Sequence, residues 1–291
     1  MVFKTISSDL MLQAHQKSKT GQLPQYIPCL SEADPQWLAV AFLSIDNQLQ
    51  IKGDSQQIFP LMSVIKPFVL LYLLEHLGEK LVFERVGNKS SDLPFNSLSQ
   101  LEIDDGFPRN PMINSGAITL ASFLIGKNSK LRAENICFWL NQKSNSKLFL
   151  SETVLNSVRS LSNPLNQAIV EKLTAKGVLE NPELALDTYN HICCLSGTVI
   201  DLVRLGLLLV KGSDYVLLKH YQIVSEIMTT SGLYEASADF AAKVGLPTKS
   251  GVSGAVLSLI PEQGAIATYS PPLNSQGNSV AGLWLVEQLN I

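Results

Sequence analysis

Apolar and polar positions change their spacing along this chain, and the changes predict its elements. Residues 7–19 mix apolar and polar side chains as an amphipathic helix does. Residues 37–45 form an almost continuous apolar run that ends in Asp46-Asn47, and a short segment follows at 49–51. This pattern predicts a strand, a tight turn and a second strand near the start of the chain.

The middle of the chain is predicted to be largely helical. The segments with helical character are 112–125, 131–142, 151–161, 164–176 and 198–211. Residues 87–111, which precede them, are rich in Gly, Ser, Asn, Asp and Pro and have little periodicity. We expect this stretch to be a long ordered loop, and loops of that length are usually functional or disordered.

Beyond Gly245 the chain is predicted to return to strands. Residues 254–260 and 265–269 are strand-like, and Pro261-Glu262-Gln263-Gly264 separates them. The last dozen residues suggest a closing element, which we predict to be a helix. Strands at both ends with helices between them suggest one sheet, built from about 1–60 and 245–291, in a single domain over 1–291.

Composition narrows the kinds of partner. Of the 291 residues, 46% are apolar and 16% are charged, so the chain can bury a substantial core. The net charge of −3 gives no reason to expect nucleic acid or an anionic membrane as partner. No apolar run reaches the roughly 18 residues that span a bilayer, and the first residues do not resemble a signal peptide. We therefore expect a cytoplasmic protein without a membrane partner.

The cysteines and histidines do not form a metal pattern. Cys29, Cys137, Cys193 and Cys194 have no C-x-x-C spacing and no metal-ligand spacing with the four histidines. A structural zinc site and a disulfide framework are both disfavoured. We expect neither a metal nor an organic cofactor.

The candidate chemistry begins at Ser63 and Lys66. An apolar run follows them at 68–74, so a helix is predicted to start at or just before Ser63. Residues three apart share one face of a helix, which brings the Lys66 amine beside the Ser63 hydroxyl. A desolvated lysine can take the proton of a serine and make it a nucleophile. For that role the pKa of Lys66 must fall from about 10.4 toward 7.

Two observations weigh on this interpretation. A serine and a lysine at this spacing also occur where the serine only caps a helix and the lysine is solvated. Pro67 disfavours helical geometry at Lys66 and is tolerated mainly in a first turn. The helix must therefore begin close to Ser63 for the two side chains to meet.

A second short motif, Lys249-Ser250-Gly251, precedes the predicted strand at 254–260. In hydrolases with a Ser-x-x-Lys motif, such a triplet lies on an edge strand opposite the nucleophile. It can also be an ordinary lysine and turn glycine before a strand. Penicillin-binding enzymes and β-lactamases need a Ser-x-N or Tyr-x-N motif between the two, and this chain has none. That absence counts against recognition of penicillins.

Longer stretches give a specific resemblance. They are NPMINSGAI (110–118), SGLY (231–234), VGLPTKSGV (244–252) and SPPLNSQGNSV (270–280). Together with the Ser63 segment and Tyr26-Ile27-Pro28, they closely resemble signatures of the serine-dependent glutaminases, in the family's order and over nearly the whole chain. The resemblance implies a serine β-lactamase-like fold. This is an α/β fold with an antiparallel sheet built from both termini and an inserted helical lobe.

The resemblance also implies catalytic roles. Ser63 would be the nucleophile, Lys66 the base that activates it, and Tyr234 the hydroxyl that relays the proton. The backbone N–H groups of Ser63 and Val252 would form the oxyanion hole. These groups suit amide hydrolysis, which needs an attacking alkoxide, stabilised charge on the amide oxygen and a proton for the departing ammonia.

Tyr26, Asn114, Asn166 and Tyr189 match family positions that hold glutamine. Each also has a simpler interpretation. Tyr26 and Tyr189 are also consistent with ordinary half-buried aromatic residues, and Asn114 with a cap of the helix after Pro111. The surroundings of Asn166 align less well with the family.

One expected acid is missing. The family has Ser-Glu about seven residues before the asparagine that matches Asn166, and that glutamate holds the α-ammonium of the substrate. Here the aligned residues are Val158-Arg159, without an acid. Glu152 follows a serine but lies about 14 residues before Asn166, so it replaces the family acid only if the loop carries an insertion. Glu152 is therefore included as a candidate ligand of the ammonium.

The resulting hypothesis is a glutaminase that hydrolyses L-glutamine to L-glutamate and ammonia through an acyl-serine intermediate. One alternative is a related amidohydrolase with a different small amide substrate. Another is a catalytically silent member that binds a ligand or a partner. The family resemblance further suggests a homodimer or homotetramer.

Overall fold

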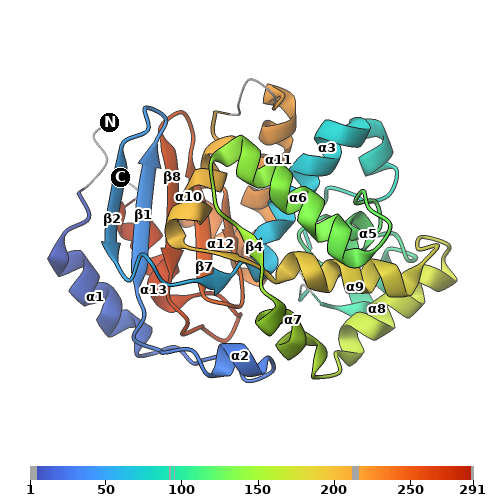
Figure 1. The fold of residues 1–291 in the computed structure, drawn as a ribbon, viewed down its shortest axis with the longest axis horizontal. Coiled ribbons are helices and arrows are strands. Elements are labelled where there is room, and N and C mark those ends of the chain that lie inside the picture. The colour runs from blue at the N-terminus through green and yellow to red at the C-terminus, as the bar shows by residue number, and fades with distance from the viewer. Residues whose placement is uncertain (1–4, 92, 95, 212–215, 290–291) are drawn as a thin grey trace.

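The computed structural model describes residues 5–91, 93–94, 96–211 and 216–289. Figure 1 shows a sheet with its covering helices on the left and a larger group of helices on the right. The main sheet has five strands in the order β2-β1-β8-β7-β6, and all neighbouring strands are antiparallel. The strands are β1 (Ala39–Ser44), β2 (Leu49–Gly53), β6 (Thr248–Ser250), β7 (Ala255–Ile260) and β8 (Gly264–Tyr269).

The pairing of β1 with β8 joins the two ends of the chain. Ala41 lies opposite Ala267 in this pair, although the two residues are far apart in sequence. The predicted sheet built from both termini is therefore confirmed. The triplet Lys249-Ser250-Gly251 begins on β6, the edge strand, as its motif predicted.

Helices cover both faces of this sheet. In β1, alternate residues point to opposite faces, so Ala39 and Ala41 join one apolar cluster and Val40 and Phe42 join another. On the second face pack α1 (Ser8–Ser18) and α13 (Val280–Leu289), and on the first packs α10 (Val199–Leu208). Because both faces are covered, β1 and β8 are buried at nearly every position. This burial explains why their sequences are almost continuously apolar.

One glycine sets how closely α10 lies on the sheet. A Cβ atom built at Gly206 would stand 2.6 Å from the Ala265 Cβ and 2.8 Å from a methyl group of Leu257. Those distances are shorter than real side chains allow, so a larger residue would push the helix off β7 and β8.

The second part of the molecule is helical and lies between β2 and β6 in the chain. Its helices are α3 (Lys66–Phe83), α4 (Leu98–Ile103), α5 (Asn114–Ala121), α6 (Ser129–Ser144), α7 (Glu152–Arg159), α8 (Pro164–Ala175), α9 (Pro182–Cys193), α11 (Leu218–Ser231) and α12 (Ser237–Lys243). A short helix α2 (Pro28–Ser31) precedes β1. A small sheet in the order β3-β5-β4 lies between the two parts, with β3 (Phe59–Pro60), β4 (Phe149–Leu150) and β5 (Leu195–Gly197).

Most predicted elements are present with somewhat different bounds, and several helices were missed. Four of the five segments predicted as middle helices enclose one (α5, α7, α8 and α10), α6 extends two residues beyond its segment at each end, and the closing element is the helix α13. The stretch 87–111 is not all loop, because α4 lies within it; its residues 92 and 95 are outside the described residues. The helices α9, α11 and α12 were not predicted.

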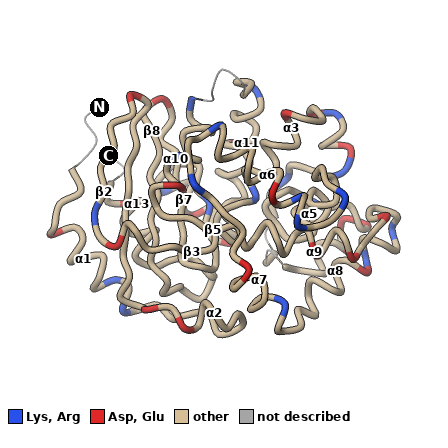
Figure 2. The backbone as a smooth tube through the Cα atoms, in the orientation of Figure 1, with Lys and Arg blue, Asp and Glu red and all other residues tan. Residues whose placement is uncertain are grey.

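Charged residues are distributed over both parts. Figure 2 shows basic and acidic positions interspersed along the helical part and the loops of the sheet rather than separated by sign. Among the helices of the described residues, none is both long enough and apolar enough to cross a membrane.

Candidate active site

Ser63 lies where the small sheet leads into the helical part. The Leu61 N–H donates to the Leu195 carbonyl at 2.8 Å, which extends the β3–β5 pairing by one residue. Met62 then adopts a left-handed backbone with φ +47° and begins the 3₁₀ turn η1 (Met62–Ile65). A non-glycine residue in this conformation costs about 1–3 kcal/mol and persists only where its surroundings enforce it. The strain therefore points to a backbone that is held in place around Ser63.

The turn η1 continues directly into α3, so Ser63 and Lys66 lie on adjoining parts of one helical segment. The Lys66 N–H donates to the Ser63 carbonyl, a bond that joins residues three apart. Pro67 occupies the first turn of α3, where its missing N–H has no helical partner in any case. The helix therefore begins close to Ser63, as the sequence required.

The Lys66 side chain is only 1% exposed. Its amine donates to the Met112 carbonyl at 3.1 Å and to the Asn114 Oδ1 at 2.9 Å. Burial lowers the pKa of Lys66 to about 8, and electrostatic interaction with Cys193 opposes the decrease. The start of α3 adds a further reason, because the positive end of a helix dipole disfavours a cation. With a pKa of about 8, about a tenth of Lys66 is a neutral amine at pH 7, far more than for an ordinary lysine.

A chain of amides and hydroxyls orients Lys66. The Asn114 Oδ1 accepts from Lys66 and also from the Tyr189 hydroxyl at 3.1 Å. The Asn114 Nδ2 donates to the Asn166 Oδ1 at 2.8 Å. Asn114 is thus not the cap of α5, whose N-cap residue is Ile113 without a side-chain bond. Within the described residues the amide nitrogen of Asn166 has no acceptor, so it is available to donate to a bound molecule.

Tyr234 lies on the other side of Ser63. It too has a left-handed backbone, with φ +58°, and its side chain is buried. Its phenol donates to the Ser250 carbonyl at 3.4 Å, and the Ser63 side chain lies close enough to affect the pKa of the phenol. Burial raises the pKa of Tyr234 well above its ordinary value, while the interaction with Ser63 acts in the opposite direction. The phenol therefore stays protonated near the serine.

The end of β6 approaches the turn that carries Ser63. A Cβ atom at Gly251 would stand 2.7 Å from the Leu61 carbonyl oxygen, so only glycine permits this approach. The Gly251 N–H is used by the Ala255 carbonyl at 2.9 Å. Across the residues that are described, neither the Ser63 N–H nor the Val252 N–H donates to another protein group. The Ser63 N–H and the Val252 N–H, one on each side of this contact, thus remain available as donors.

Tyr26 stands at the edge of the group. Its side chain is largely exposed, just before α2. Electrostatic interaction with Tyr26 is among the causes, after burial, that raise the pKa of both Tyr189 and Tyr234. Its phenol therefore lies near both of theirs, although in this structure it is open to solvent.

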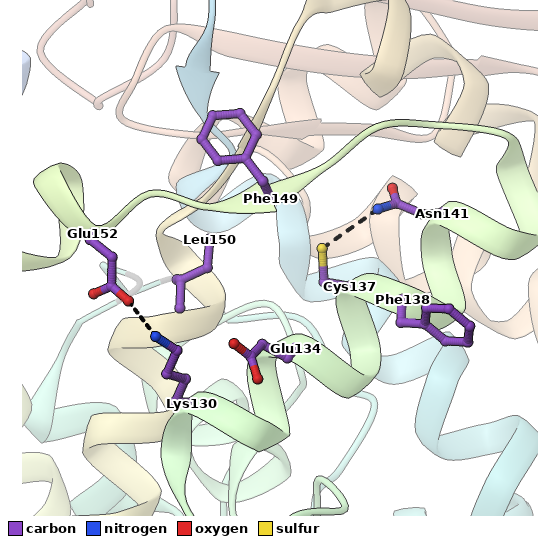
Figure 3. Close-up of a pocket in the computed structure, with 8 residues that line it drawn as sticks. All are labelled: Lys130, Glu134, Cys137, Phe138, Asn141, Phe149, Leu150 and Glu152. Atoms are coloured by element: carbon purple, nitrogen blue, oxygen red, sulfur yellow. Dashed lines mark hydrogen bonds and ion pairs between the residues drawn. The ribbon is translucent and has the colours of Figure 1, made fainter.

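Glu152 is not brought into this group. It begins α7 and forms an ion pair with Lys130 at 2.8 Å, with more than half of each side chain exposed. Figure 3 shows this pair in a surface pocket bordered by α6 and β4. None of the residues around Ser63 named above lines that pocket, whose lining comprises Lys130, Glu134, Cys137, Phe138, Asn141, Phe149, Leu150 and Glu152.

Arg159, at the position aligned with the missing acid, also points elsewhere. Its guanidinium pairs with Asp187 of α9. Tyr189 is two residues further along α9, and residues two apart face nearly opposite sides of a helix. Arg159 and Asp187 therefore lie on the side of α9 away from Tyr189.

Cys193 is a neighbour of the site that the sequence reasoning missed. It lies one turn beyond Tyr189 on α9, is buried, and is close enough to Tyr189 for the two side chains to affect each other's pKa. Burial raises the pKa of the Cys193 thiol to about 11, and interaction with Lys66 opposes the increase. The signal that would have found it is the start of α9, where Asn181 caps the helix and Pro182 occupies the first turn.

Comparison with known proteins identifies relatives of the whole chain. The model of the Glutaminase family matches residues 21–290. A glutaminase of Synechocystis sp. is 45% identical over 278 residues, which cover 95% of this chain and 85% of that protein. The solved structure of the probable glutaminase ybaS superposes with a TM-score of 0.88 at 32% identity, and 98% of this chain and 97% of that one are covered.

A second solved structure carries a bound compound. It is a probable glutaminase from Bacillus subtilis complexed with 6-diazo-5-oxo-L-norleucine, with a TM-score of 0.86 and 26% identity. The similarity covers 99% of this chain and 95% of that chain. Both structures are glutaminases with the serine β-lactamase-like fold, so the predicted fold is confirmed.

The buried Lys66 should make the stability of the fold depend on pH. With a pKa of about 8 in the folded state and 10.5 unfolded, Lys66 binds more protons in the unfolded state between those values. The free energy of unfolding should therefore rise with pH across this window, relative to Lys66→Met, by about 1.4 kcal/mol per pH unit. Urea unfolding of both proteins from pH 7 to 10.5 measures the difference. A constant difference would show that Lys66 is not desolvated.

Proposed function

The chain belongs to the glutaminase family, and from that we propose that it hydrolyses L-glutamine to L-glutamate and ammonia through an acyl-enzyme on Ser63. The observation that carries the proposal is that Ser63 and the buried Lys66 lie three residues apart on one helical segment, and that desolvation lowers the pKa of Lys66. The buried phenol of Tyr234 lies near Ser63, whose side chain affects its pKa. A hydroxyl, a neutral amine and a protonated phenol are the groups that acyl transfer from an amide requires.

The first half of the reaction forms the acyl-enzyme. The Ser63 oxygen attacks the carboxamide carbon, and its proton passes to the neutral Lys66 amine. The carbonyl oxygen becomes an oxyanion, which the Ser63 and Val252 N–H groups stabilise; one such donor is typically worth about 10²–10³ in rate. The C–N bond then breaks, and the nitrogen leaves as ammonia with a proton that Tyr234 relays from the Lys66 ammonium.

The second half regenerates the serine. Water attacks the ester carbon and gives a proton to Lys66, and the bond between Ser63 and the acyl group breaks. Glutamate leaves, and the serine regains its proton through Tyr234. Every proton transfer uses side chains of the chain itself, so the proposed reaction needs no metal and no organic cofactor.

Recognition of the substrate is assigned to Tyr26, Asn114, Asn166 and Tyr189. Asn114 and Tyr189 hold Lys66 in place, so their contact with glutamine would be coupled to the catalytic amine. The amide N–H2 of Asn166 suits a substrate carboxylate or carbonyl, because it is a donor without an acceptor in the described residues. Tyr26, which is exposed, is suited to contact the substrate at the entrance.

Two further features are inferred from the family resemblance and the composition. We expect the chain to act as a homodimer or homotetramer, and we expect it in the cytoplasm. Static light scattering on the purified protein tests the first expectation.

Ser63→Ala should abolish the release of ammonia from L-glutamine while the circular dichroism spectrum is retained, because no other hydroxyl replaces the nucleophile. 6-Diazo-5-oxo-L-norleucine, which the Bacillus subtilis protein binds, supplies a second measurement. Mass spectrometry should find this compound covalently attached to Ser63 in the natural chain and absent from the variant. Turnover retained in Ser63→Ala would refute the nucleophile, and an unlabelled, inactive natural chain would support the silent alternative.

The pH dependence of kcat/KM should follow the titration of Lys66. Because the base acts as a neutral amine, kcat/KM should rise with pH and level off above about 8, rather than near the ordinary lysine pKa of 10.5. Asn114→Asp places a negative charge against the amine and favours its protonated form, so the rise should move to higher pH. Ammonia release measured from pH 6 to 10 compares the two. An unshifted profile would assign the titration to another group.

Glu152→Gln should leave KM for L-glutamine within about twofold, because Glu152 pairs with Lys130 at the surface. Asn166→Ala is the matched comparison and should raise KM about tenfold, since it removes a donor that faces the site. Steady-state kinetics of both variants separate the two positions. A large increase in KM for Glu152→Gln would show that Glu152 moves into the site when the substrate binds.

A further inference from the structure

Lys249 is a buried lysine for which the proposed reaction has no step. It lies in the middle of β6, and its side chain is fully buried, with 0% exposure. A buried ammonium is costly unless its protons are all accepted, so a lysine in this position needs a physical reason. Its contacts indicate what that reason is.

The Lys249 amine joins β6 to the segment that carries Tyr234. It donates to the Gly232 carbonyl at 2.9 Å and to the Ser250 carbonyl at 2.8 Å. It also lies 4.5 Å from the centre of the Tyr234 ring. The Ser250 carbonyl accepts from the Tyr234 phenol as well. The Lys249 amine therefore contacts the Tyr234 ring, the Ser250 carbonyl that accepts from the Tyr234 hydroxyl, and the carbonyl of Gly232, two residues before Tyr234.

The segment needs such support because its backbone is strained and tightly packed. Tyr234 has a φ of +58°, in a region that non-glycine residues seldom adopt. A Cβ atom at Gly232 would stand 1.8 Å from the Thr248 carbonyl oxygen, so the turn lies directly against β6. Without bonds across this contact, the turn would relax and move the phenol away from Ser63.

The charge state of Lys249 fits this role. Burial and repulsion from Lys66 lower the pKa of Lys249 to well below its usual value. A neutral amine has two N–H groups, which equals the number of carbonyls that it reaches. In its neutral form Lys249 adds no charge beside Lys66. Its effect on the reaction is therefore expected through geometry rather than through the base.

We propose that Lys249 is a positioning residue that fixes the Tyr234 phenol against Ser63 by binding the Gly232 and Ser250 carbonyls. This inference rests on the proposed function, because it requires that Tyr234 relays the proton. Lys249 should therefore affect kcat, whereas substrate binding depends on other residues.

A double-mutant cycle with Lys249→Met and Tyr234→Phe tests the proposal. Methionine keeps the length of the side chain and removes both N–H donors. Lys249→Met should lower kcat about 10²-fold, the typical cost of a displacement of about 1 Å, with KM within about threefold. Tyr234→Phe should lower kcat by about 10²–10⁴, the typical range for a general acid or base. The double variant should lie within about threefold of Tyr234→Phe alone.

The outcomes separate the two hypotheses. If Tyr234→Phe retains full activity, the proposed relay is wrong. If Tyr234→Phe loses activity but the two losses multiply, Lys249 acts independently of Tyr234 and the positioning proposal alone is overturned. A loss that falls on KM instead of kcat would also overturn it. The pH profile of Lys249→Met should keep its rise near pH 8, since Lys66 is unchanged.

Thr248→Val is the matched control on the same strand. The buried Thr248 hydroxyl donates to the Leu246 carbonyl at 3.0 Å and forms a hydrogen bond with the Ser258 hydroxyl at 2.7 Å, and neither partner belongs to the segment that carries Tyr234. Loss of the Thr248 hydroxyl should lower stability with little effect on kcat. If Lys249→Met does not fold, Lys249→Gln, which keeps an amide donor, enters the same cycle. Failure of both Lys249 variants to fold would assign the residue to stability and overturn the proposal.

Discussion

The site depends on one physical constraint, the placement of an amine inside the protein at the start of a helix. Lys66 is buried, and its surroundings satisfy its N–H groups with a carbonyl and an amide oxygen. These partners come from the segment that begins α5, and α9 and α8 supply Tyr189 and Asn166 behind them. Hydrogen bonds around one buried amine thus join three helices that are distant in sequence to α3.

The second constraint is the close approach of two backbones across the site. At Gly251 the end of β6 lies against Leu61, and at Gly232 the turn before Tyr234 lies against Thr248. Both contacts are too short for any side chain. They bring the nucleophile turn, the edge strand and the tyrosine together, and the left-handed conformations of Met62 and Tyr234 occur where these segments bend to meet. The backbone strain is confined to these two residues, and the hydrogen bonds and packing around them offset its free energy.

Features of the site that depend on residues close together in sequence could be predicted, whereas contacts between distant segments could not. The position of Ser63 and Lys66 on one helical segment depends on three residues and on where a helix begins, so local rules predicted it. The edge position of Lys249 followed from a motif. The contact of Lys249 with Gly232 could not be predicted, because it depends on how β6 and α11 pack. The same holds for Cys193, since α9 was itself missed despite its Asn181 cap. Glu152 was chosen because it follows a serine, as the family acid does, although its spacing from Asn166 differs from the family's. A Ser-Glu pair does not show which side of α7 faces the site.

The pairing of β1 with β8 has a consequence for synthesis in the cell. A ribosome makes Ser63 and Lys66 early, whereas the strand that precedes Val252 and the partner of β1 emerge only near the end of translation. Contacts between distant parts of a chain form late and slowly in folding. The nascent polypeptide therefore carries Ser63, the proposed nucleophile, through most of its synthesis without the Val252 N–H proposed to face it. The proposed site is complete only after the ribosome has made the late segments that carry Tyr234, Lys249 and Val252.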